Sequence, residues 1–177
     1  VYTITPIYDG NEDCEGTTYT YTVTVNPLTG VSFIDDIVVC NGDSIEDIEF
    51  TSTTQGGETT YEWVATGDDI GLDQTDDGSG LISGFTADNI TLEPLITSIT
   101  VTPTFTNGGV SSEGDPLTFT ITVNPTGQVD SVDSLDICNG DTAVVDFTTS
   151  NGGIDSVTTY SWAVSYTHLR AHETKTD

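Results

Sequence analysis

Positive charge is nearly absent from this sequence. Of its 177 residues, 29 are Asp or Glu, only 2 are Lys or Arg, and 2 are His, which gives a formal net charge of -27. The four basic or titratable nitrogen side chains, His168, Arg170, His172 and Lys175, all lie at the C-terminal end, so residues 1–163 contain none. Nucleic acid and anionic membrane surfaces are both bound through Lys and Arg, so we expect neither as a partner.

The same absence limits catalysis. Without His, Lys or Arg in residues 1–163, a Ser–His or Cys–His pair, a Lys nucleophile and an Arg clamp cannot form there. Paired carboxylates remain available, but nothing in the sequence marks one pair as desolvated. There is also no apolar run near the roughly 20 residues that a membrane-spanning helix needs. We therefore expect a protein that is neither an enzyme nor inserted in a membrane.

The C-terminal end differs in composition from the rest. Residues 164–174, VSYTHLRAHET, resemble the in-frame translation of a sequencing-library adapter. The alternative is a natural basic segment. We interpret residues 164–177 as a non-native tail and assign no function to its histidines, because such segments do not belong in an argument about the fold.

The remaining sequence repeats itself. The recurring motifs are Thr20–Pro27 with Thr118–Pro125, Cys40–Asp43 with Cys138–Asp141, Thr59–Trp63 with Thr158–Trp162, and Thr5–Tyr8 with Thr102–Phe105, at offsets of 98, 98, 99 and 97. A period of about 98 residues is a whole domain rather than one turn of a solenoid. We expect the end of one copy in residues 1–27, a complete copy in 28–125 and the start of a third in 126–163, within a longer protein.

Within a copy, apolar and polar residues alternate. Tyr19, Tyr21, Val23 and Val25 are separated by threonines, and Phe119, Ile121 and Val123 follow the same rule. This period of two predicts strands with one buried and one solvated face, typical of antiparallel sheets. Strands are predicted near 31–39, 45–52, 59–66, 80–86, 96–106 and 116–125, with Gly/Asp/Asn-rich turns between them. The expected fold is all-β: tandem antiparallel β-sandwich repeats.

Trp63 lies in the middle of a predicted strand, with Tyr61 two residues earlier on the same face. The simplest interpretation is a core anchor of the sandwich. The rival interpretation is an exposed aromatic pair that stacks on sugar rings. The return of the indole as Trp162 in the third copy favours a structural role.

The motifs together resemble the PKD-like repeats of bacterial secreted and surface proteins. They are T-x-T-V-N-P (Thr22–Pro27 and Thr120–Pro125), V-C-N-G-D (Val39–Asp43), T-T-Y-x-W (Thr59–Trp63), F-T-A-x-N (Phe85–Asn89) and I-T-V-T-P (Ile99–Pro103). The resemblance covers nearly all of residues 1–162. It implies an immunoglobulin-like sandwich, arrayed in tandem in long exported proteins that include adhesins.

Three cysteines, Cys14, Cys40 and Cys138, are too far apart for a CxxC metal or redox motif. The resemblance implies a disulfide between the cysteine of the C-N-G-D turn and one just before the last strand. Cys14 holds that second position, whereas Ser112 replaces it in the complete copy. An incomplete disulfide framework, a Cys14–Cys40 bridge across the junction, and buried free thiols all remain open.

An acidic loop follows Trp63. It carries Asp68, Asp69, Asp73, Asp76 and Asp77 between Gly67 and Gly80. Oxygen-rich loops bind Ca²⁺. The EF-hand template fails, however: in a 12-residue loop that starts at Asp73, the last position requires a bidentate Glu and is Gly84. A weak Ca²⁺ site and a solvated acidic loop both remain open; no other cofactor is expected.

These observations predict a non-catalytic structural or adhesive repeat of a long exported bacterial surface protein, located outside the cell. Its expected partners are neighbouring repeats of the same chain, with a glycan or a cell-surface protein as a further ligand. The alternative is an accessory spacer or carbohydrate-binding module of a secreted multidomain enzyme.

Overall fold

The fold is known from a computed structural model, which describes residues 1–72, 77–153 and 156–164. The regular structure of these residues consists of strands alone, so the predicted all-β fold is confirmed. The strands are β1 (Tyr2–Ile4), β2 (Ile7–Tyr8), β3 (Cys14–Glu15), β4 (Tyr19–Tyr21), β5 (Ile37–Cys40), β6 (Ser44–Ile45), β7 (Glu58–Gly67), β8 (Asp77–Ser79), β9 (Phe85–Thr86), β10 (Leu95–Asn107), β11 (Val110–Glu113) and β12 (Leu117–Asn124).

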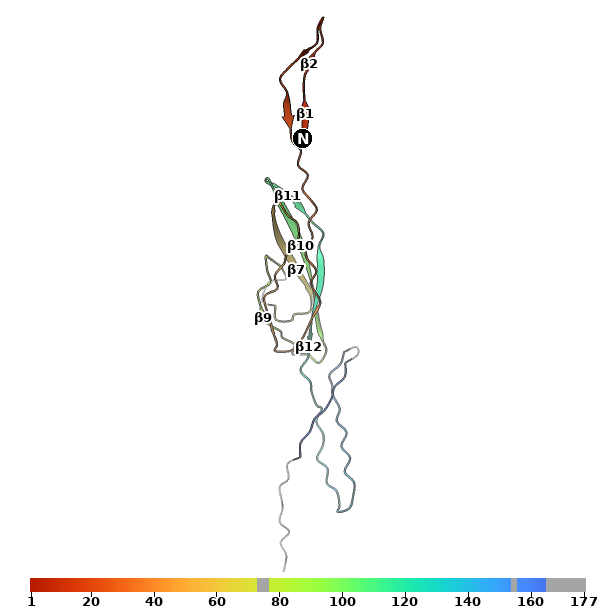
Figure 1. Ribbon diagram of the computed structural model, residues 1–177. Coiled ribbons are helices and arrows are strands. Elements are labelled where there is room, and N and C mark those ends of the chain that lie inside the picture. The colour runs from red at the N-terminus through yellow and green to blue at the C-terminus, as the bar shows by residue number, and fades with distance from the viewer. Residues whose placement is uncertain (73–76, 154–155, 165–177) are drawn as a thin grey trace, which may run out of the picture.

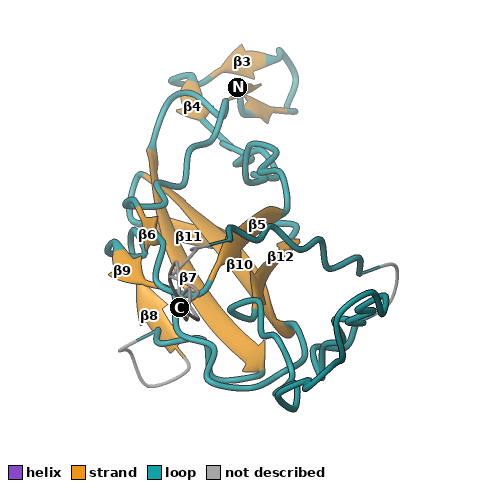
Figure 2. Ribbon diagram, turned by 90° about the horizontal axis from the view of Figure 1, so that it is seen from below, coloured by secondary structure: helices purple, strands orange, loops and turns teal. Residues whose placement is uncertain are grey.

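One six-stranded sheet organises the central part of the chain. Its order is β5-β12-β10-β7-β8, and β11 adds to β10 (Figure 2). The pairs are antiparallel, as the alternating pattern predicts, with one exception: β5 runs parallel to β12. A parallel pair joins strands far apart in sequence. Here it places the first strand of residues 28–125, which we call the central unit, beside their last strand.

The second layer is much less regular. It consists of the β6–β9 pair and an isolated bridge between Ile48 and Ile82. Between this layer and the sheet lies one apolar core, whose fully buried members are Trp63, Ile70, Ile82, Ala87, Ile99, Val101, Phe119, Ile121 and Val123. The buried side chains of β10 and β12 come from alternate positions. The alternation in the sequence therefore gives each strand one buried and one solvated face, as predicted.

The strand predictions succeed where the alternation is long. The ranges 59–66, 96–106 and 116–125 correspond to β7, β10 and β12. The predicted strand at 31–39 is wrong over most of its length, because only the stretch from Ile37 onward is paired. Strands at 45–52 and 80–86 shrink to β6 and β9, and β8 and β11 were not predicted.

Trp63 is the largest side chain of the core and is only 1% exposed. Its strand β7 pairs with β10 on one side, where Val101 is its neighbour, and with β8 on the other, where Gly78 is its neighbour. The indole covers Gly78 so closely that a Cβ atom built there would lie 2.5 Å from Trp63 Cζ2. Glycine is thus required in β8 because the aromatic ring occupies the space of its side chain.

Tyr61 lies on the same face of β7 and is half-buried. Its ring packs against Phe50 with the centroids 5.8 Å apart. Burial raises the pKa of the Tyr61 hydroxyl above its ordinary value, so the phenol stays neutral at physiological pH. Tyr61 therefore extends the aromatic part of the core toward the second layer.

One long hairpin with two short ladders forms the N-terminal end of the molecule, at the top of Figure 1. β1 pairs with β4, and β2 pairs with β3. The pairs are Tyr2 with Tyr21, Thr3 with Thr20, Ile4 with Tyr19, Ile7 with Glu15, and Tyr8 with Cys14. At the repeat offsets these become Ile99 with Phe119, Thr100 with Thr118, Val101 with Leu117, Thr104 with Glu113, and Phe105 with Ser112, which are the pairs of β10 with β12 and β11.

The two segments also share a turn contact. Gly16 donates its N–H to the carbonyl of Pro6 at 2.8 Å, and Gly114 donates to Pro103 at 2.8 Å. Residues 1–21 therefore have the strand pairing of the last third of the central unit. They differ in burial, because the apolar side chains of this hairpin are exposed.

Replacement of Gly78 by alanine should destabilise the central unit by about 1–3 kcal/mol, the usual cost of overpacking a tight core. The indole of Trp63 cannot move aside without disturbing the strands on both sides of it. Urea denaturation followed by tryptophan fluorescence measures the change. Gly30→Ala is the matched control, since a Cβ there meets nothing within 4 Å. Equal stability of the two variants would contradict this packing.

Candidate functional site

The Cys-Asn-Gly-Asp motif forms a tight turn at the end of β5. Cys40 donates its N–H to Asp43 Oδ2 at 2.8 Å, and Asp43 donates its own N–H to the Cys40 carbonyl at 3.1 Å. Gly42 has φ of 89°, a conformation that glycine adopts without strain. The residues of the motif are therefore those that the turn requires.

This turn binds a second motif, Phe-Thr-Ala-x-Asn. Gly42 donates its N–H to the Ala87 carbonyl, and Ala87 donates to the Asp43 carbonyl, both at 2.8 Å. Asn89 donates its N–H to Asn41 Oδ1 at 2.8 Å. The Asn41 N–H in turn reaches the carbonyl of Asn124, in the Asn-Pro motif that ends β12, at 2.9 Å. Three motifs separated in the sequence thus meet at one junction.

Asn89 is the centre of this junction and is 2% exposed. Its Nδ2 donates to the carbonyls of Val123 at 2.7 Å and Glu93 at 2.8 Å. Its Oδ1 accepts the N–H and the hydroxyl of Thr91, at 2.9 and 2.7 Å. A buried amide with all these partners fixes the loop before β10 to the end of β12. We call residues 40–43, 87–91 and 124 the motif junction.

The motif junction explains which residues the sequence motifs contain, and its role is structural. Asn89 belongs to the F-T-A-x-N motif, but the sequence alone indicated no function for it. The signal was available: a lone Asn at a fixed place between two strands is a frequent side-chain partner for backbone groups. What periodicity could not show is that its partners would be 34 and 48 residues away.

The cysteines are free thiols, and all three are exposed. Cys40 points away from the core, so the alternative of a buried thiol is wrong for this residue. Ser112, the counterpart of Cys14, has a buried hydroxyl without a hydrogen-bond partner. The cysteine residues therefore offer three accessible sulfur atoms and, in the structure, no bridge.

Two carboxylates of the acidic loop accept hydrogen bonds from backbone N–H groups. Asp68 Oδ2 accepts the N–H of Ile96 at 2.8 Å, and Asp69 Oδ1 accepts the N–H of Gly71 at 3.0 Å. Asp73 and Asp76 lie outside the described residues, and of Asp77 only the backbone is described, in β8. Within the described part of the chain, no three acidic, His or Cys side chains gather as a metal site would require.

Residues 126–162 keep several contacts of the central unit. Phe147 packs on Tyr160 with centroids 5.9 Å apart, as Phe50 does on Tyr61. Cys138 and Asp141 close the same turn as Cys40 and Asp43, with the Cys138 N–H 3.1 Å from Asp141 Oδ2. This segment carries the local contacts of the first half of the central unit without regular strands in its described residues.

A hydrogen-bonded carboxylate stabilises the start of this segment. Asp130 accepts the Ser150 hydroxyl at 2.6 Å and the Thr148 hydroxyl at 2.8 Å. These two bonds lower the pKa of Asp130 below its ordinary value. The charged form is the one they favour, so their contribution is present at neutral pH and disappears as the pH falls through the lowered pKa.

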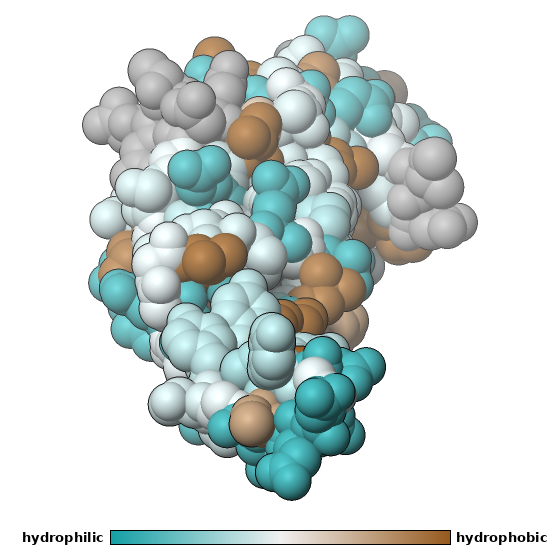
Figure 3. All heavy atoms as spheres, turned by 90° about the horizontal axis from the view of Figure 1, so that it is seen from above, coloured by the Kyte–Doolittle hydropathy of each residue, from teal (hydrophilic) through white to brown (hydrophobic). Residues whose placement is uncertain are grey.

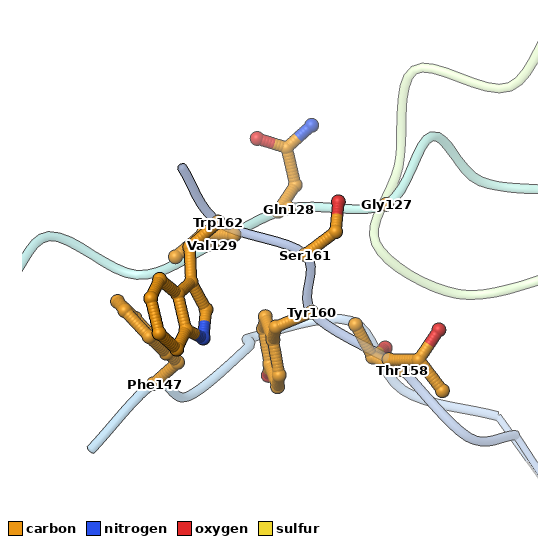
Figure 4. Close-up of a pocket in the computed structure, with 9 residues that line it drawn as sticks. Gly127, Gln128, Val129, Phe147, Thr158, Tyr160, Ser161 and Trp162 are labelled. Carbon is orange, nitrogen blue, oxygen red and sulfur yellow. The ribbon is translucent and has the colours of Figure 1, made fainter. Parts of the chain in front are cut away.

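Trp162 behaves differently from Trp63. It is 73% exposed and borders an open hollow of about 390 Å³ (Figure 4). Phe147, Tyr160 and Val129 line the same hollow, with Gly127, Gln128 and residues 158, 159 and 161. In the central unit the counterpart Trp63 is buried in the core, and β10 and β8 pair on either side of its strand. In the described residues nothing covers Trp162.

Exposed apolar residues occur at both ends of the molecule. Tyr2, Ile4, Tyr8 and Tyr21 are exposed at the N-terminal end, and Figure 3 shows apolar patches between hydrophilic areas when the molecule is seen from that end. The described residues include no helix of the length and apolarity that spanning a membrane would take.

The comparison with known families gives a match over a short part of the chain. The family model described as PKD-like domain matches residues 1–29. No curated protein matches the chain. PKD-like domains are commonly extracellular, serve as surface or structural modules and are typically non-catalytic. The matched residues are those whose strand pairing recurs in β10, β11 and β12.

Replacement of Asn89 by alanine should lower the free energy of unfolding by about 2–3 kcal/mol, because it leaves buried carbonyls without donors. Asn107→Ala is the control, since no side-chain hydrogen bond of Asn107 is formed in the structure and its exposure is greater. Urea denaturation of both variants gives the comparison. A cost for Asn107→Ala as large as that for Asn89→Ala would contradict the role of the motif junction.

The thiols should react as their exposure indicates. We expect a thiol reagent such as DTNB to label three sulfur atoms per native chain, at similar rates with and without prior reduction. A Cys14–Cys40 bridge would instead leave one reactive thiol before reduction and three after it. Mass spectrometry of the labelled chain identifies which residues react.

Proposed function

We propose that the chain is part of a non-catalytic repeat array in a long exported bacterial surface protein, where it acts as a stalk or as a cell-surface interaction module. The observation that carries this proposal is the shared strand register of residues 1–16 and 19–21 with β10, β11 and β12. A register shared over several strand pairs is what repeated copies of one unit produce. The PKD-like match at residues 1–29 agrees with it.

The geometry of the central unit suits a load-bearing stalk. Residues 1–21 and 126–162 leave it at opposite ends (Figure 1). β5, its first strand, and β12, its last, run parallel and are hydrogen-bonded from Ile37 to Cys40. Tension along the chain would pull these two strands past each other, so their hydrogen bonds are loaded together rather than one after another. Asp36 adds a further link, since its Oδ1 accepts the Thr120 N–H at 2.7 Å.

The partners that we propose are neighbouring repeats of the same chain, and a glycan or a cell-surface protein as an external ligand. The surface is strongly acidic, with a net charge of -27. Like charges keep neighbouring molecules apart and limit edge-to-edge pairing of strands. Both effects favour an extended array in the medium outside the cell.

The second candidate is an accessory or carbohydrate-binding module of a secreted enzyme. The observation in its favour is the open aromatic hollow formed by Trp162, Tyr160 and Phe147, because exposed aromatic rings stack on sugars. The argument against it is that Trp63, Tyr61 and Phe50 hold the equivalent positions inside the core. Binding of soluble glycans to the chain that is lost in Trp162→Ala would favour this candidate.

Pulling experiments test the stalk directly. With the chain held between reference domains of known unfolding force, the central unit should unfold in one force peak. Its 98 residues span at most roughly 320–350 Å when fully extended. The increase in contour length on unfolding should equal this extended length minus the end-to-end length of the folded unit. Asp36→Ala should lower the peak force, because the Thr120 N–H loses its acceptor.

Asp35→Ala is the matched control, since Asp35 is exposed, carries the same charge and makes no hydrogen bond in the structure. It should leave the peak force unchanged. Extension of the chain without a distinct peak would contradict a load-bearing function.

A further inference from the structure

Asn26, in the first Asn-Pro motif, makes a contact that the proposed function does not use. It is the one residue of the segment 1–28 that is not exposed. Its Nδ2 donates to the carbonyl of Val110 at 2.9 Å. Val110 begins β11 and pairs with Asn107 across the β10–β11 turn, at the end of the central unit nearest the N-terminal hairpin (Figure 1). The end of one copy is thus attached to a turn of the next.

The backbone that follows this contact has little freedom. Asn26 precedes Pro27, so its backbone is confined to extended conformations, and the proline ring fixes φ of Pro27 itself. Two residues later Thr29 is only 2% exposed. Its carbonyl accepts the N–H of Asp115 at 3.1 Å, and its hydroxyl forms hydrogen bonds 3.0 Å long inside the central unit. Only Pro27 and Leu28 therefore separate two fixed points.

We propose that the β10–β11 turn is the docking site of the Asn-Pro motif that ends the preceding copy, and that this contact makes the linker a rigid joint rather than a hinge. Domains that share a small interface normally move relative to each other. Here one side-chain hydrogen bond is sufficient, because only two residues lie between the fixed points and one of them is proline. The assignment of the contact to consecutive copies rests on the proposed function.

The second Asn-Pro motif is held from the other side. The carbonyl of Asn124 accepts the N–H of Asn41 at 2.9 Å, and Asn41 Nδ2 donates to Thr126 Oγ1 at 2.9 Å. The counterpart of Thr126 in the first linker is Leu28, so the backbone bond is the part of this contact that both linkers can share. The central unit thus holds the linker that enters it through Val110 and the linker that leaves it through Asn41.

The docking site is defined by the shape of the turn. Gly108 and Gly109 have φ of 59° and 75°, the conformation that a two-residue turn between right-handed twisted strands requires. A Cβ at either glycine would meet nothing within 4 Å, so these glycines serve the backbone and not the packing. The acceptor is a main-chain carbonyl, and the amide of Asn donates to such a group without bringing a charge.

The joint is uncharged in an otherwise acidic chain. The net charge is -27, yet no Asp or Glu occurs between Glu15 and Asp35, and none occurs in residues 106–112. Carboxylates here would repel the carbonyl of Val110 and one another, so their absence allows the two copies to meet at this point. Away from the joint, repulsion between acidic copies favours an extended arrangement. Charge and contact therefore act in the same direction.

NMR relaxation of the ¹⁵N-labelled 177-residue chain tests the joint. Order parameters of backbone N–H groups are about 0.85 in rigid segments and below about 0.6 in flexible ones. We expect Asn26 and Leu28 to have the values of a rigid segment, although neither lies in a strand. The side-chain Nδ2 group of Asn26 should be ordered with them. This measurement reads the linker itself and does not require a rigid N-terminal hairpin.

Asn26→Asp keeps the size of the side chain and removes its donor. The order parameter at position 26 should fall below about 0.6, and that of Leu28 should fall with it. Urea denaturation of the central unit should be unchanged, because the contacts of Thr29 remain. Asn107→Asp is the matched control: it adds the same charge at the same turn, and Asn107 forms no side-chain hydrogen bond with the described residues. It should leave the linker as ordered as in the wild-type chain.

Three results would overturn the proposal: a flexible linker in the wild-type chain, an unchanged order parameter in Asn26→Asp, or an equal loss of order in Asn107→Asp. The pulling experiment loads the central unit and does not depend on the linker. A missing force peak with an ordered linker would overturn the stalk and leave the joint. A flexible linker with a normal force peak would do the reverse.

Discussion

The burial of a single indole ring, that of Trp63, is the constraint on which the central unit depends. The ring needs glycine beside it in β8, small or branched residues beside it in β10, and a second layer above it. These requirements explain why strands as different as the 13-residue β10 and the 3-residue β8 belong to one sheet. The second layer has little regular pairing and consists of the β6–β9 pair and the Ile48–Ile82 bridge beside this core.

Polar contacts fix the loops and the strand ends, whose positions apolar packing in the core does not determine. The motif junction joins the turn after β5, the loop before β10 and the end of β12 through the buried amide of Asn89. The parallel pairing of β5 with β12 ends at this junction, with the pair of Cys40 and Asn124. The conformation of a loop and the position of the first strand therefore depend on the same few hydrogen bonds.

The parts of the fold that could be predicted are those where one physical rule acts alone. Alternating Thr and apolar residues determine β7, β10 and β12, because both faces of these strands have a clear preference for water or core. In residues 45–52 the acidic residues Glu46, Asp47 and Glu49 interrupt this preference, and regular pairing ends after Ile45. β8 was not predicted, because its Gly78 is required by the packing of Trp63, and the local sequence does not show that these two residues are neighbours.

The candidate site shows the same limits. Trp63 and Trp162 occupy equivalent sequence positions, yet one is buried and the other is exposed, because exposure depends on strands far away along the chain. The parallel register of β5 and β12 also escapes a periodicity argument, since period two is the same in parallel and antiparallel pairs. The acidic loop was predictable as a loop, whereas the backbone partners of Asp68 and Asp69 were not.

The matching pairing of residues 2–21 and 99–119 has an evolutionary consequence. A recombination event that exchanges these segments at equivalent codons replaces one set of strands by another with the same register. Every core between the first and the last crossover point would still close, whatever the position of the break within the period. For the repeat array that we propose, this would allow copies to be gained or lost by unequal crossing-over without a precise cut at a domain boundary.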